Sequence, residues 1–70
     1  MAQERLNYIK GKVEEILNHT MYSKDVRWRA IKIEMALAKN KPYEEIEKMY
    51  QQMQIQIADE IVGQRFDKIV

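Results

Sequence analysis

The sequence has no cysteine, one histidine, one proline and two glycines among its 70 residues. Without cysteine it forms neither a disulfide nor a thiolate zinc site, and a single histidine excludes a histidine-rich metal site. No apolar run approaches the roughly 18 residues of a membrane span. The N-terminal stretch carries charges where a signal peptide has an apolar core, as its first twelve residues read MAQERLNYIKGK. We therefore expect a cytoplasmic protein with no metal, no cofactor and no membrane contact.

The length predicts a single domain over residues 1–70. A chain of this size buries only about 60% of the surface that its unfolded form exposes. Small scaffolds are commonly stabilised by disulfides, a metal or a partner chain. Since the composition removes the first two, we expect self-association or another protein to complete the core.

Apolar residues recur at intervals of three and four in three segments, which is typical of amphipathic helices. The pattern predicts an all-α fold with helices over about residues 3–21, 24–39 and 42–69. Ser23 suits the N-cap of the second helix, Asn40 a left-handed stop after it, and Pro42 the first position of the third. The third helix would be about 40 Å long, so we expect it to overhang the bundle, bend, or pack on a second copy.

The second predicted helix is apolar on two sides. One stripe holds Val26, Ala30, Ile33 and Leu37, and the other holds Trp28, Ile31, Met35 and Ala38. A helix that is apolar all round is usually central and packs on two neighbours, which predicts Trp28 in the core. The alternative is an exposed surface for an acidic partner, formed by Arg27, Trp28, Lys32 and Met35.

The end of the third predicted helix, IQIADEIVGQRFDKIV, also carries two apolar stripes. Ile57 and Ile61 continue the stripe that starts at Ile46, and we expect them to close the bundle. The second stripe has no evident partner within the chain, which predicts self-association as a homodimer through Ile55, Val62, Phe66 and Ile69. In the alternative, Gly63 ends the helix and residues 64–70 fold back over the bundle.

Charge is unevenly distributed along the chain. Residues 22–41 carry six basic and two acidic side chains, a balance of +4, whereas residues 42–70 carry three basic and six acidic ones, a balance of −3. Such segments attract each other or different partners. The basic charge of the second predicted helix therefore favours an acidic protein, or nucleic acid, as its partner.

Catalytic chemistry is hard to assemble from these residues. The chain has no phosphate-binding glycine loop, and its one histidine, His19, follows Glu15 by four positions. Carboxylate-bridged di-metal bundles instead need Glu and His three positions apart on two helices. We interpret His19 as a solvated helix-end residue, and the sequence predicts no catalytic residue.

Residues 35–50, MALAKNKPYEEIEKMY, resemble the opening of a helix-turn-helix of the LuxR or sigma-factor type. In those families a similar stretch precedes the recognition helix, so the resemblance implies a DNA-binding regulator. The next residues of this chain read QQMQIQIADEIVGQR, a segment that lacks a turn signal at its start and carries Asp59 and Glu60. A recognition helix needs donors for base edges and little negative charge near phosphates.

The sequence predicts a small, non-enzymatic helical module that binds proteins, acting as a homodimeric regulator, inhibitor or assembly factor. We expect its partners to be a second copy of itself and a further protein that the sequence does not name. The alternative is a dimeric DNA-binding regulator that uses the basic second helix.

Overall fold

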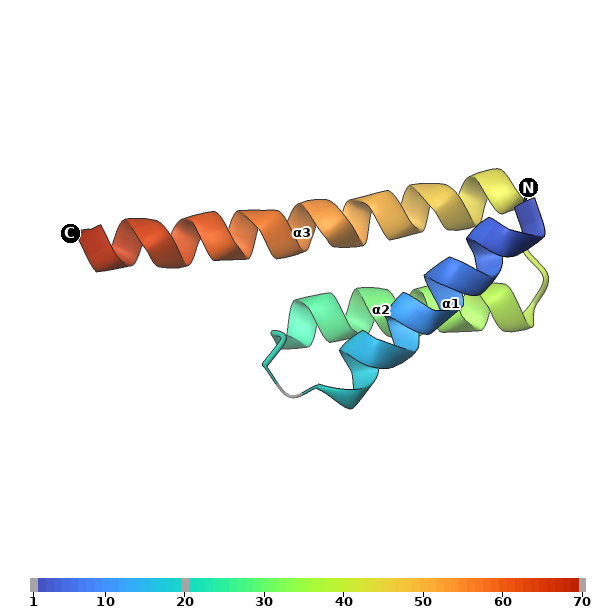
Figure 1. Ribbon diagram of the computed structural model, residues 1–70, viewed down its shortest axis with the longest axis horizontal. Helices are drawn as coiled ribbons and strands as arrows, with labels where there is room; N and C mark the ends of the chain where they lie inside the picture. Colours follow the sequence, from blue (N-terminus) through green and yellow to red (C-terminus); the bar gives the residue numbers. More distant parts are fainter. Residues whose placement is uncertain (1, 20, 70) are drawn as a thin grey trace.

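A computed structural model describes residues 2–19 and 21–69 of the chain, with side chains up to Gly63. It contains three helices, α1 (Ala2–Asn18), α2 (Lys24–Ala38) and α3 (Tyr43–Ile69), and no strand among the described residues. Figure 1 shows α2 running antiparallel beside α3, with α1 crossing at an angle. The predicted all-α class and the three helices are confirmed.

The core lies where one face of each helix meets the other two. The apolar stripe predicted for α1 is buried, since Ile9, Val13 and Ile16 are each less than a twentieth exposed. α2 supplies four buried residues, and α3 supplies Ile46, Tyr50 and Met53. The four buried residues of α2 are Val26, Ala30, Ile33 and Ala36.

Helix ends follow local chemistry that the sequence signals in part. Ser23 is the N-cap of α2, as predicted, and its side-chain oxygen accepts a hydrogen bond from the Val26 amide. Asn40 has φ 56°, the left-handed conformation expected of a helix stop. α3 begins at Tyr43 rather than at Pro42, because the Pro42 carbonyl accepts from the Ile46 amide and so occupies the cap position.

The first helix is shorter than predicted. It ends at Asn18 instead of residue 21, and the His19 amide bonds the Ile16 carbonyl three positions back, which tightens the last turn. The chain then turns toward α2 over residues that the apolar spacing does not distinguish from helix. Thr20, within the predicted helix, lies outside the described residues.

The third helix is continuous through Gly63, so the alternative in which residues 64–70 fold back is wrong. Its 27 residues span about 40 Å, whereas the 15 residues of α2 span about 22 Å. The C-terminal part of α3 consequently projects beyond both other helices (Figure 1). The radius of gyration is 13.3 Å, against about 11 Å for a compact domain of this length.

Candidate interaction surfaces

The second half of α3 exposes a row of apolar side chains, which begins beside the bundle and continues onto the part that projects. Ile55 is 60% exposed and Val62 52%, and Ala58 between them is also exposed. Ile55 follows the buried Ile46 by nine positions, which places it about 180° round the helix from the core. We call Ile55, Ala58 and Val62, with the helical positions of Phe66 and Ile69, the α3 outer stripe. The side chains of Phe66 and Ile69 lie outside the described residues.

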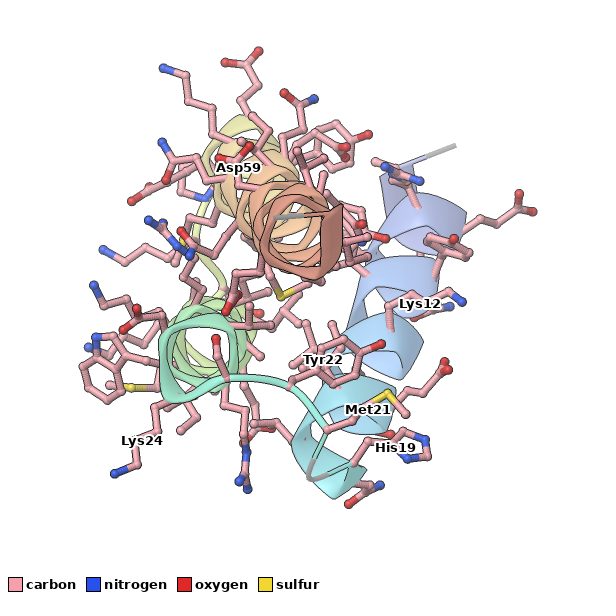
Figure 2. The ribbon with its side chains drawn as sticks, turned by 90° about the vertical axis from the view of Figure 1, so that its left-hand side faces the viewer. Lys12, His19, Met21, Tyr22, Lys24 and Asp59 are labelled. Atoms are coloured by element: carbon pink, nitrogen blue, oxygen red, sulfur yellow. The ribbon has the colours of Figure 1, made fainter. Side chains whose placement is uncertain are left out.

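The α3 outer stripe is apolar only along the second half of the helix. Toward the N-terminus the same line of α3 continues through Gln51, Lys48 and Glu44, all of them exposed. Asp59 lies on the side of α3 that is turned away from α1 and α2 (Figure 2). The apolar residues are therefore concentrated on the second half of the helix, which includes the part that projects.

Ile57 and Ile61 close the bundle less completely than expected. Ile57 is half-buried against the core, but Ile61 is exposed because α3 has by then passed the ends of the other two helices. Together with Met21, Tyr22 and Val26 they line a groove of about 570 Å³ at this end of the bundle. Viewed along α3, Tyr22 lies below α3 and between the other two helices (Figure 2).

A polar contact fixes the edge of this groove. The Ser23 hydroxyl donates to a Glu60 carboxylate oxygen at 2.9 Å while it accepts from the Val26 amide at 3.2 Å. Among the side chains that the structure describes, this is the hydrogen bond farthest along α3. Beyond Glu60 the helix continues to Ile69 without α1 or α2 beside it (Figure 1).

The outer side of α2 forms a second surface, and here the expectation of a buried tryptophan is wrong. Trp28 is 55% exposed and Met35 49%, with Ile31 exposed beside them. The two stripes of α2 have the same spacing, but α1 and α3 both pack on the stripe of Val26 and Ile33. The helix is central, as predicted, yet it buries only one side.

Basic side chains surround this apolar patch, which we call the α2 outer face. The Lys32 ammonium lies 5.5 Å from the centre of the Trp28 ring, within cation–π range. Lys39 and Lys41 line a shallow groove of about 210 Å³ with Met35 and Met49, and Glu45 is its one acidic lining residue. Of the four predicted partner-binding residues, Trp28, Lys32 and Met35 are therefore together. Arg27 lies about 140° round the helix from Lys32, on the opposite flank of the patch.

A polar and aromatic cluster ties α1 to α3, and sequence reasoning missed it. The Arg5 guanidinium donates to both carboxylate oxygens of Glu47, with the shortest distance 2.8 Å. The same guanidinium lies 5.2 Å from the ring centres of Tyr8 and Tyr50, which meet edge to face. Arg5 and Glu47 are 42 positions apart, so no local spacing in the sequence signals the pair.

The perturbed pKa values belong to this cluster. The hydrogen bond from Arg5 lowers the pKa of the Glu47 carboxyl below its ordinary value of 4.5. Burial, followed by a hydrogen bond with Tyr8, raises the pKa of Tyr50. The carboxylate and the guanidinium satisfy each other here beside the two tyrosine rings, an arrangement that joins two helices rather than one that activates a nucleophile.

Two further features, a metal site and a membrane-spanning helix, can be assessed over the described part of the chain. The described part of the chain holds no group of three or more His, Asp or Glu side chains placed to bind a metal ion. None of its helices, over the residues that can be described, has both the length and the apolar character needed to cross a bilayer.

No protein-family model, curated protein or solved structure matches the chain. The function is accordingly inferred from the two exposed surfaces.

Proposed function

We propose that this chain is a small helical module that acts by binding proteins rather than by catalysis. It pairs with a second copy through the α3 outer stripe, with Ile55, Val62, Phe66 and Ile69 at the interface. The observation that carries the proposal is the exposure of Ile55 and Val62 on a helix that continues beyond its own bundle. In this role it would work in the cytoplasm as a regulator, inhibitor or assembly factor.

Physical chemistry supports a partner for the projecting helix. An isolated helix shorter than about 12–15 residues is marginal in water, because most helical stability in proteins comes from packing an apolar face. Along the described part of the outer stripe, Ile55 and Val62 are exposed and lack intramolecular packing of that kind. Burial of Ile55 and Val62 against another helix contributes about 25 cal/mol per Å² before ordering costs. Pairing would thus stabilise the helix and cover its apolar residues together.

The proposal is tested by placing a charge in the stripe. Val62→Asp adds a carboxylate where an apolar contact is expected, and Gln52→Asp adds the same charge at an exposed α3 position outside the stripe. Mass is measured by light scattering after gel filtration, and folding by circular dichroism. We expect the wild type and Gln52→Asp to form dimers and Val62→Asp to remain a folded monomer. Equal masses for the two variants would contradict the proposal.

A second candidate function is supported by the α2 outer face. An exposed tryptophan and methionine ringed by lysines suit an acidic protein segment with an apolar anchor, because both the charge and the apolar contact are complementary. In the alternative, the same basic side chains contact DNA phosphates without sequence specificity, as in a dimeric DNA-binding regulator. The acidic segment is the better match, since Trp28, Ile31 and Met35 offer apolar area that a phosphate backbone does not use.

Fluorescence separates these two uses, because Trp28 is the sole tryptophan of the chain. Its emission is followed during titration with an acidic amphipathic peptide and with duplex DNA, each at low and at higher salt. We expect the peptide to shift the emission toward shorter wavelength, and Lys32→Ala to weaken binding more than Lys10→Ala on α1. Steeply salt-dependent binding of duplex alone would favour the DNA-binding alternative, and no response to either would remove this second function.

A further inference from the structure

Resting on the proposed self-association, we propose that the two copies of α3 pair antiparallel, with Val62 on the two-fold axis. The α3 outer stripe is symmetric about this residue. Counted outward from Val62 in each direction, the next residue of the stripe comes after four positions, and another comes three positions further. The pairs that are equidistant from Val62 are Ala58 with Phe66, and Ile55 with Ile69.

An antiparallel two-fold pair brings equidistant positions to the same height. Position 69 of one copy then meets Ile55 of the other, and position 66 meets Ala58, so every layer is apolar. Each layer also combines suitable volumes, because the largest residue of the stripe faces the smallest, which helps side chains to interdigitate. A parallel pair in register would stack Phe66 on Phe66 and Ala58 on Ala58, which forces the helices apart at one layer and leaves space at another.

The polar half of the same line on α3 favours the antiparallel arrangement independently. Glu44, Lys48 and Gln51 precede Ile55 at the spacing of the stripe, and all three are exposed. A parallel pair in register would place Glu44 against Glu44 and Lys48 against Lys48, and like charges brought together at an interface oppose association. In the antiparallel pair only Val62 meets its own copy, so neither Glu44 nor Lys48 faces a like charge from the same position of the partner.

The arrangement has consequences for size and strength. The helices overlap over residues 55–69, about 22 Å of helix, and the two bundles lie at opposite ends of the pair. This is fewer residues than the roughly 20–30 that a standard interface contributes from each side. We therefore expect reversible association in the micromolar range, with both α2 outer faces left free.

Cysteine crosslinking tests the register directly, because the natural chain contains no cysteine. Three single variants, Val62→Cys, Ile55→Cys and Ile69→Cys, are each oxidised at a concentration at which the protein is dimeric. A mixture of Ile55→Cys and Ile69→Cys is oxidised under the same conditions. A disulfide needs Cα atoms roughly 4.4–6.8 Å apart. In the antiparallel pair the two copies of position 55 are about 21 Å apart along the axis. Sedimentation under reducing conditions checks that each variant still dimerises, and circular dichroism checks its fold.

We expect Val62→Cys to crosslink to itself, and Ile55→Cys and Ile69→Cys to crosslink only when they are mixed. Efficient self-crosslinking of Ile55→Cys would show a parallel pair and overturn the antiparallel register while leaving self-association intact. A variant Val62→Cys that dimerises but does not crosslink would overturn it as well. A monomer at every concentration, for the wild type and all variants, would instead refute the proposed self-association itself.

Discussion

Arg5 of α1 and Glu47 of α3 form a paired hydrogen-bonded contact, with the guanidinium Nη2 2.8 Å and Nε 3.1 Å from the two carboxylate oxygens. The rings of Tyr8 and Tyr50 lie at equal distance from the guanidinium. α1 and α3 otherwise meet over a short stretch, whereas α2 packs extensively on both. The pair therefore joins the two helices that have the least contact with each other.

Replacing Glu47 tests this role. Glu47→Gln keeps the shape and one acceptor but removes the charge from the hydrogen bonds with Arg5. We expect the melting temperature to fall by a few degrees, since the contact is paired but partly solvated. Glu14→Gln, at an exposed position of α1, is the matched control and should leave melting unchanged. Equal melting of the two variants would mean that the pair adds nothing to stability.

The same pair predicts a dependence of stability on pH. The pKa of Glu47 is lower in the folded protein than its ordinary value of 4.5, so the folded state favours the ionised carboxylate. Its contribution is present above pH 4.5 and is lost as the pH falls through the lowered pKa of the folded state. Urea unfolding of the wild type and Glu47→Gln at several pH values measures this. The difference between them should shrink on acidification; a constant difference would be incompatible with this linkage.

Two apolar residues of α2 should differ sharply in their response to truncation. Ile33 is fully buried, and Ile33→Ala leaves a cavity that costs about 2–5 kcal/mol, a large part of the stability of a domain this small. Trp28→Ala removes a larger but exposed side chain, and we expect only a small change in the free energy of unfolding. Urea unfolding at one fixed protein concentration compares them. A comparable loss in Trp28→Ala would mean that the tryptophan is packed after all.

Substituting each of the two glycines by alanine distinguishes an effect on helix stability from an effect on self-association. A Cβ at Gly11 or Gly63 meets nothing within 4 Å, so alanine fits at both and favours the helix by about 0.8–1.0 kcal/mol. We expect Gly11→Ala to raise the melting temperature without changing the dissociation constant of the dimer. Gly63→Ala should lower that constant, because it stabilises the helix that forms the interface. An identical dissociation constant for both would argue against pairing through the projecting part of α3.

Sequence patterns predict the helices and most of their core. Apolar residues spaced three and four positions apart identify the buried face of a helix when the helix has a single apolar stripe. α1 is the clear case, because its apolar residues repeat on one face only and Ile9, Val13 and Ile16 of that face are buried. α2 is ambiguous, since two stripes share the same spacing and only the placement of α1 and α3 decides which is buried. The predicted end of α1 is three residues late because apolar spacing continues into the turn.

For the candidate surfaces, the sequence predicts some exposed residues but not the contacts between distant segments. Ile55 and Val62 could be assigned to an exposed stripe because helix length alone shows that α3 outruns its neighbours. The exposure of Ile61 depends on where α1 and α2 end, which sequence patterns define only to within a turn. The pairing of Arg5 with Glu47, and of Ser23 with Glu60, depends on tertiary geometry between distant segments. Long-range polar contacts of this kind leave no periodic signal in a single sequence.

Sedimentation equilibrium of the wild-type protein over a wide concentration range tests the central claim most directly. A single chain has a mass of 8.4 kDa, and a pair through the α3 outer stripe has twice that mass. We expect the weight-average mass to rise with concentration from the monomer value toward that of the dimer, and to remain monomeric for Val62→Asp. A wild-type mass that stays at 8.4 kDa up to near-millimolar concentration would contradict self-association through α3.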